Sequence, residues 1–214
     1  MADVGSGTGL LARELLRRRY VVIAIEPNAA MRAMADALLS NCPNYCSIAA
    51  SAEATSLADG SVDLVAAAQA FHWFDVAAVR REWLRILAPN GRVALIWNTR
   101  PLDDPLQQAV DDVLGEFGGV RHDALTAQQQ LSTVAPFFAG APYEQFEVPH
   151  SQPLERAGFV SLVLSRSTMP DRDTPAGRRA EQVIFSLFDR YVTNAAVTVN
   201  YRTVAFLGRP AAAR

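Results

Sequence analysis

The sequence has little that would tie it to a membrane or to nucleic acid. No apolar run approaches the about 18 residues of a membrane span, and Asp3 with several glycine and polar residues stands where a secretory signal would begin. The net charge is −2 at pH 7, which gives no electrostatic attraction to DNA, RNA or anionic lipid. The only dense basic cluster, Arg17-Arg18-Arg19, is expected to complement a helix dipole. We therefore expect neither a nucleic-acid partner nor a membrane partner.

Cysteine is also scarce, since Cys42 and Cys46 in "CPNYC" are the only two. Zinc would need two further ligands, and no His or Cys lies nearby to supply them. We expect two free thiols in a reducing cytoplasm and no metal site. With 50% hydrophobic residues in 214, the chain can bury a substantial core, which predicts one domain and leaves a homodimer open.

Strands and helices alternate over the first hundred residues. The helices are expected at Ala29–Leu39 and at 78–89, where Pro89 stops the second and Asn90-Gly91 turns the chain. This alternation predicts the α/β class, with a doubly wound, Rossmann-like, mostly parallel sheet. The expected strands are Tyr20–Glu26, Tyr45–Ala50, Val62–Ala68 and Arg92–Trp97.

Beyond Trp97 strands and helices no longer alternate. A loop and then a helix are expected there, and the pair Gly118-Gly119 is expected to end the helix. Short helical pieces are expected from Val120 to Gly140. The remaining elements are a strand at Tyr143–His150, helices within 153–167 and 175–192, and an alternating segment, Val197–Pro210, that predicts an antiparallel C-terminal strand.

Three glycines open the chain with Gly-x-Gly-x-Gly spacing at Gly5, Gly7 and Gly9. Such residues allow a tight turn and a close approach of backbone to ligand beside a helix N-terminus. A nicotinamide dinucleotide fingerprint would have Gly or Ala at position 10, where this chain has Leu10. A nicotinamide-dependent oxidoreductase is therefore the less favoured alternative.

Two carboxylates support the interpretation that the glycine turn binds a ligand. Asp3, two residues before Gly5, can pair with a cationic group of a ligand, and Glu26, at the end of the second strand, can accept hydrogen bonds from two ribose hydroxyls. The alternatives are a loop or helix-capping acid for Asp3 and a solvated strand end for Glu26.

The motifs "ADVGSGTGLL", "VVIAIEPNAAM", "SAEATSL", "VDLVAAAQAFHWFD" and "EWLRILAPNGRVALIWN" occur in this order between Ala2 and Asn98. Together they resemble a class I S-adenosylmethionine-dependent methyltransferase, of the type 11 or small-molecule subgroup that resembles trans-aconitate and ubiquinone-pathway methyltransferases. The resemblance implies S-adenosyl-L-methionine as cofactor and methyl transfer to O, C or N of a small-molecule acceptor. It also implies a single domain over 1–214, with a cofactor half at about 1–98, acceptor-side and cap elements at about 99–170, and a closing helix and strand at about 171–214.

The resemblance also assigns cofactor contacts by position. The segment from Asp3 to Gly9 would hold the methionine part, Glu26 the ribose, and residues after the second and third strands the adenine. Residues after the fourth strand would face the sulfonium. The implied cofactor residues are Asp3, Gly5, Gly7, Thr8, Gly9, Glu26, Pro27, Met31, Ala52, Glu53, Gln69 and Ala70.

The stretch "AFHWFD" supplies aromatic side chains after the fourth strand. We expect Phe71, His72 and Trp73 to contact the acceptor, because an aromatic wall favours a cation, and His72 to act as a base or to orient the acceptor. The alternative is that these aromatics are core residues before a helix capped by Asp75, which is the interpretation we favour for Phe74.

Two further expectations concern what surrounds this site. Family members usually carry a strand start and one or more helices before the glycine turn, so we expect an N-terminal truncation that lowers activity or leaves a non-catalytic cofactor-binding domain. The stretch from Thr99 to Ser167 has no cluster of Arg or Lys that would predict a binding site for a carboxylate. Scattered candidates are Arg100, Arg121, Arg156 and Arg166.

Overall fold

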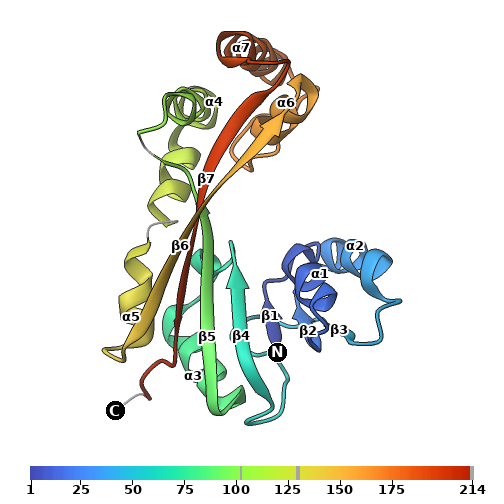
Figure 1. Ribbon diagram of the computed structural model, residues 1–214, viewed down its shortest axis with the longest axis vertical. Helices are drawn as coiled ribbons and strands as arrows, with labels where there is room; N and C mark the ends of the chain where they lie inside the picture. Colours follow the sequence, from blue (N-terminus) through green and yellow to red (C-terminus); the bar gives the residue numbers. More distant parts are fainter. Residues whose placement is uncertain (102, 129–130, 213–214) are drawn as a thin grey trace. The chain divides into compact units, whose positions relative to one another are not determined.

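A computed structural model describes residues 1–101, 103–128 and 131–212, with the side chains of 120–128 left undescribed. Its sheet has seven strands in the order β3-β2-β1-β4-β5-β7-β6 (Figure 1). The chain divides into two compact units. Unit 1 comprises Met1–Trp97, Leu131–Phe146 and Val204–Arg214, and unit 2 comprises Asn98–Gln130 and Glu147–Thr203. The single-domain organisation and its subdivisions stay predictions.

The sheet begins with five strands: β1 (Ala2–Val4), β2 (Val22–Ile25), β3 (Tyr45–Ile48), β4 (Val62–Ala68) and β5 (Leu87–Thr99). The pairings of β1 with β2 and β4, of β2 with β3, and of β4 with β5 are all parallel. The later strands, β6 (Tyr143–Leu154) and β7 (Val197–Gly208), add an antiparallel part. The predicted α/β class and mostly parallel sheet with an antiparallel C-terminal strand are confirmed.

Three helices connect the parallel strands: α1 (Leu10–Arg17), α2 (Ala29–Leu39) and α3 (Val76–Ile86). The predicted bounds of α2 are confirmed, because Asn28 accepts hydrogen bonds from the Ala30 and Met31 amides and so fixes its start. Asp75 caps α3 in the same way, as the core interpretation of "AFHWFD" required. Trp83 on α3 is fully buried in the core of unit 1.

The predicted turn at Asn90-Gly91 is wrong. The helix α3 already ends at Ile86, and β5 begins at Leu87 and runs through the Asn-Gly pair. Val62 pairs with Leu87 while Leu64 pairs with Arg92, so the start of β5 bulges. A Cβ at Gly91 would lie 3.0 Å from the Val62 carbonyl oxygen, so close backbone packing at the bulge explains the glycine.

Outside the parallel strands, η1 (Phe71–Trp73), η2 (Leu131–Thr133) and α5 (Val134–Phe138) belong to unit 1, whereas α4 (Pro105–Gln128), α6 (Arg156–Leu164) and α7 (Pro175–Tyr191) belong to unit 2. The predicted helix end at Gly118-Gly119 is wrong in part. Gly119 has φ 53° and interrupts the helical backbone, but helix resumes and runs to Gln128. Among the described residues, no helix is long and apolar enough to cross a bilayer.

Candidate functional site

The candidate cofactor residues all lie in unit 1: Asp3 is on β1, and the others are on loops and helix starts that follow β1, β2, β3 and β4. Because these strands are parallel, their carboxyl ends meet at one edge of the sheet. Ligands of doubly wound sheets bind outside this edge, near the point where strand order reverses. Here that point is β1, which lies between β2 and β4.

The glycine turn after β1 uses its three glycines for different purposes. All three have positive φ, 68° at Gly5, 56° at Gly7 and 81° at Gly9, which side chains disfavour. A Cβ at Gly5 would lie 2.6 Å from the Cβ of Ala70, and one at Gly9 would lie 2.8 Å from Leu39 Cδ1. A Cβ at Gly7 would meet nothing within 4 Å. Gly5 and Gly9 therefore serve packing, whereas Gly7 presents bare backbone to open space.

Glu26 binds the glycine turn directly, a contact that the sequence did not predict. The Gly7 amide donates to Glu26 Oε2 at 3.0 Å, and the Asn28 amide donates to Oε1 at 2.9 Å. The side chain is not a solvated strand end, since Glu26 is only 7% exposed. A carboxylate offers about four lone-pair sites, so about two remain for a ligand's hydroxyls. This arrangement fits a ribose.

Asp3 lies under the same turn, on β1, and is 1% exposed. Its Oδ2 atom is buried and has no hydrogen-bond partner in the described structure. Burial raises the pKa of Asp3 to about 7; a backbone hydrogen bond from Ala12 opposes this shift, and the charge of Glu26 adds to it. A ligand's cationic amino group would satisfy this unpartnered oxygen and favour its charged form. The methionine part of S-adenosylmethionine carries such a group, so the residue present fits the cofactor.

The loop after β3 carries Ala52 and Glu53, and both are tied to the region of α3. The Trp83 indole Nε1 donates to the Ala52 carbonyl at 3.0 Å, and Ala52 is 4% exposed. The Asp75 amide donates to Glu53 Oε1 at 3.2 Å. Glu53 thus has a structural partner, and its contact with adenine stays a prediction.

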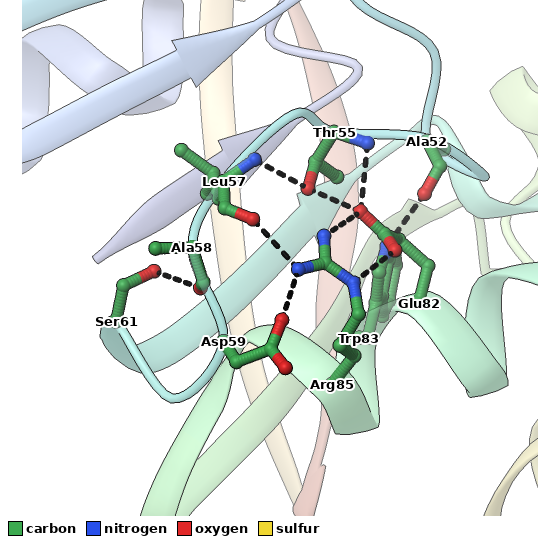
Figure 2. A network of polar contacts seen from close by, with 9 residues as sticks. All are labelled: Ala52, Thr55, Leu57, Ala58, Asp59, Ser61, Glu82, Trp83 and Arg85. Carbon is green, nitrogen blue, oxygen red and sulfur yellow. Dashed lines mark hydrogen bonds and ion pairs between the residues drawn. The ribbon is translucent and has the colours of Figure 1, made fainter.

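Figure 2 shows how α3 holds the rest of this loop. Glu82 Oε1 accepts from the Thr55 amide at 2.8 Å and from the Thr55 hydroxyl at 2.6 Å. Arg85 donates to both Glu82 oxygens, to Asp59 Oδ1 at 2.6 Å and to the Leu57 carbonyl at 2.7 Å. Hydrogen bonds from Arg85 and Thr55 lower the pKa of Glu82 to about 2. We call Glu82 and Arg85 together the α3 clamp.

The segment after β4 begins with Gln69, whose φ of 56° is unusual for a residue with a side chain. Ala70 follows and packs against Gly5, while Phe71 is 1% exposed. The Phe71 ring lies 5.9 Å from that of Trp83 and 5.0 Å from that of Phe137, centre to centre. Core packing therefore accounts for Phe71, and its contact with an acceptor stays a prediction.

His72 and Trp73 differ from Phe71. Trp73 is 60% exposed, and its ring centre lies 5.0 Å from that of His72. The Nδ1 atom of His72 is buried without a recorded partner, and burial lowers the pKa of the imidazole. A neutral imidazole beside an exposed indole can accept a proton and offer a flat apolar surface to a small molecule.

The remaining candidates lie at the rim of the same edge. Thr8 is half-buried in the glycine turn, Pro27 is exposed after β2, and Met31 is 44% exposed in the first turn of α2. No group of His, Cys, Asp or Glu among the described residues is arranged to hold a metal ion. The Arg121 side chain lies outside the described part of the chain.

Comparison with known proteins shows which proteins this chain is similar to. Residues 2–95 match the family model described as a methyltransferase domain. An uncharacterized methyltransferase of Mycobacterium tuberculosis is 33% identical over 165 residues, covering 77% of this chain and 63% of that protein. The chain therefore spans less than two thirds of the length of this relative.

Two solved structures share the fold. A protein of Anaeromyxobacter dehalogenans, assigned as a type II methyltransferase, has a TM-score of 0.66 at 23% identity, covering 97% of this chain and 88% of that one. The geranyl diphosphate C-methyltransferase of Streptomyces coelicolor, solved with Mg²⁺, geranyl diphosphate and S-adenosyl-L-homocysteine, has a TM-score of 0.51 at 13% identity, covering 98% and 70%. The match over residues 2–95, with the glycine turn and the two strand-end carboxylates, is to a methyltransferase domain, and the two solved structures share its fold.

Proposed function

We propose that this chain transfers the methyl group of S-adenosylmethionine to a small-molecule acceptor. The observation that carries the proposal is the contact between the two predicted cofactor loops. Gly7 faces open space, and its amide donates to Glu26. The remaining lone pairs of this carboxylate could accept hydrogen bonds from the hydroxyls of a ligand at the same place. A buried, unpartnered oxygen of Asp3 supports a cationic group beside it.

The residues would divide the work as follows. Asp3 and the glycine turn would hold the amino-acid end of the cofactor, Glu26 the ribose, and Ala52 with Met31 the adenine. When bound, S-adenosylmethionine supplies a methyl group already activated by the sulfonium charge. The chain's own residues therefore need mainly to orient the acceptor and exclude water.

His72 and Trp73 would form the acceptor side of the site. The lowered pKa of His72 keeps its imidazole neutral near pH 7, so that it can take a proton from an acceptor O–H or N–H group. Trp73 would cover the acceptor with its exposed ring. A cytoplasmic location and a homodimer stay predictions from the sequence, and the comparisons give the nicotinamide alternative no support.

Calorimetry with S-adenosylhomocysteine and with NAD tests cofactor choice. We expect binding of the first and none of the second. Glu26→Gln should weaken S-adenosylhomocysteine binding about tenfold, because an amide nitrogen cannot accept a hydrogen bond from an amide or hydroxyl. Glu14→Gln is the matched control, since Glu14 lies on α1 and pairs only with exposed arginines in the recorded contacts.

Turnover needs a separate measurement. Labelled S-adenosylmethionine and a panel of small hydroxyl, amine and carboxylate compounds should yield at least one labelled product. Binding of S-adenosylhomocysteine with equal affinity by the Glu26→Gln and unmodified chains would overturn the site. Binding without any labelled product would favour a non-catalytic cofactor-binding domain instead.

A further inference from the structure

An open hollow of about 420 Å³ lies in unit 1 at the start of β5. Its walls come from residues 89–92, 142–144 and 208–209, which are the start of β5, the start of β6 and the end of β7. The volume falls within the about 300–1,000 Å³ that is typical of small-molecule sites. Because β5 runs parallel to β4, its start lies at the edge of the sheet opposite the candidate cofactor residues. The proposed methyl transfer therefore does not account for this hollow.

The β6 side of the hollow is held in place by close packing. A Cβ at Gly208 would lie 2.9 Å from the Tyr143 Cβ and 3.0 Å from the Pro142 carbonyl oxygen, so the absence of a side chain lets β7 approach β6 closely. The Tyr143 ring is stacked on the Phe138 ring, with 4.6 Å between the ring centres. Pro89 adds a further apolar surface from the β5 side. The hollow thus has apolar walls of which one is rigid.

Arg209, directly after β7, also lines the hollow and is oriented by the bulge at the start of β5. Its Nη1 atom donates to the Ala88 carbonyl at 2.7 Å and to the Gly91 carbonyl at 3.0 Å, which uses both hydrogens of that nitrogen. Its Nε and Nη2 atoms have no hydrogen-bond partner among the described residues, and neither is buried. Together these two nitrogens form a fork of parallel N–H groups that matches a carboxylate.

The hollow carries one unbalanced positive charge. Arg92 donates to Glu144 and, at 3.2 Å, to the Leu207 carbonyl, so the charges of Arg92 and Glu144 offset each other. Arg209 has no carboxylate partner among the residues that the structure describes. A ligand with a single negative charge would neutralise it, whereas a dianion would also meet the repulsion of Glu144.

We propose that this hollow binds a small carboxylic acid with an apolar body, as its monoanion, at a site separate from that of methyl transfer. The carboxylate would lie on the free fork of Arg209. Because two backbone carbonyls already hold this guanidinium, binding would cost little side-chain entropy. The apolar body would pack against Pro89, Pro142 and the Tyr143 ring. The bulge that the sequence did not predict thus creates the site, since its carbonyls orient the arginine.

Binding of benzoate to the full chain tests the proposal without cofactor or product. Calorimetry at about 150 mM chloride compares benzoate with neutral benzamide, with acetate and with inorganic phosphate. We expect one benzoate site and no binding of benzamide. Acetate should bind at least about tenfold more weakly than benzoate, because it lacks the body that covers the apolar walls. Equal affinity for benzamide and benzoate, or tighter binding of phosphate, would overturn the assignment to a carboxylate.

Variants locate the site. Arg209→Gln should weaken benzoate binding about tenfold to a hundredfold, because the charged fork is lost. Arg209→Lys keeps the charge without the fork and should retain only part of the affinity. Glu144→Gln should tighten binding about twofold to fivefold, since it removes a neighbouring negative charge. Arg17→Gln is the matched control, because Arg17 is an exposed arginine of α1 in the same unit and its loss changes the net charge equally.

Saturating S-adenosylhomocysteine separates this site from the proposed cofactor site. Benzoate affinity should be equal with and without it, because the two sites lie at opposite edges of the sheet. Competition between the two ligands would place benzoate at the cofactor edge and overturn the proposal. So would equal weakening by Arg209→Gln and Arg17→Gln, or the absence of benzoate binding by the unmodified chain. If Arg209→Gln lowers the melting temperature, Glu144→Gln still decides, because that side chain is exposed and unchanged or weaker binding would contradict the site.

Discussion

The turn at Gly5–Gly9 follows β1, the loop at Ser51–Ser61 follows β3, and each carries residues predicted to contact the cofactor. The first is shaped by its own backbone, through three positive φ angles and the close packing of Gly5 and Gly9. The second contains one glycine, Gly60, and takes its shape from α3, through Trp83 and the α3 clamp.

This difference determines what can disturb each loop. The backbone-defined turn tolerates no added Cβ at its packed glycines, Gly5 and Gly9, and it contacts a titratable side chain through the bond from the Gly7 amide to Glu26. A loop held by side chains can be loosened by one substitution on a distant helix, or by protonation of the acid that holds it. The predictions below test this contrast, from the largest expected effect to the smallest.

Gly5→Ala should destabilise the chain most. The added Cβ would lie 2.6 Å from the Ala70 Cβ, on a residue with φ 68°. Overpacking costs about 1–3 kcal/mol and the left-handed conformation about 1–2 kcal/mol, so we expect a loss of about 2–5 kcal/mol in urea unfolding. Gly7→Ala, with open space around its Cβ, is the control and should lose only the about 1–2 kcal/mol that the left-handed conformation costs. Equal losses for the two variants would contradict the packing role of Gly5.

Asp3→Asn should stabilise the cofactor-free chain above neutral pH. The folded pKa of Asp3, about 7, lies above its ordinary value of 3.8, so the native state binds more protons than the unfolded state between these values. Stability contributed by the protonated form is therefore lost as pH rises through about 7. The unfolding free energy of Asp3→Asn minus that of the unmodified chain should therefore be about 1–3 kcal/mol larger at pH 8 than at pH 4.

Urea unfolding of both chains at pH 4 and pH 8 measures this difference. The same substitution should weaken S-adenosylhomocysteine binding, because it removes the carboxylate that we propose pairs with the cofactor's amino group. A stability difference that does not change with pH would show that Asp3 is not the titrating group.

Glu82→Gln should release the loop after β3. The pKa of Glu82 is lowered to about 2, so its stabilising contribution is present above about pH 4.5 and is lost as pH falls toward 2. We expect the unfolding free energy to fall by about 1–2 kcal/mol at pH 7 and by less at pH 3. Amide hydrogen exchange at Thr55 and Leu57 should become faster. Asp59→Asn is the control, because the Asp59 side chain is 82% exposed and its pair with Arg85 should contribute little. An unchanged exchange rate at Thr55 in Glu82→Gln would contradict the clamp.

The two loops also differ in how far the sequence predicts them. Positive φ at three closely spaced glycines is a local property, and so is the Asn28 cap that starts α2, so both could be predicted from neighbouring residues. The contact of Glu82 with Thr55 spans 27 positions, and nothing in the spacing of these residues indicates it.

Where local rules were wrong, tertiary structure overrode them. Asn90-Gly91 is a strong turn signal, yet pairing with β4 draws these residues into a bulged strand. Gly119 takes a non-helical φ of 53° as a helix-ending glycine would, but the chain resumes a helix after it. In both places the glycine conformation was foreseeable and the path of the chain beyond it was not.

Trp73→Ala should have the smallest effect on stability and a clear effect on methyl transfer. Trp73 is 60% exposed, so its loss should change unfolding free energy by less than about 0.5 kcal/mol. Trp83→Ala is the opposite case, since Trp83 is fully buried and bonded to Ala52, and should lose about 3–5 kcal/mol.

With an acceptor found by the labelled-cofactor screen, single-turnover transfer by Trp73→Ala should fall about tenfold, while S-adenosylhomocysteine affinity stays unchanged. Unchanged transfer would place the acceptor elsewhere, and unfolding of Trp73→Ala would return this tryptophan to the core. The contrast between the two tryptophans then separates the residue that holds the loop after β3 from the one proposed to cover the acceptor.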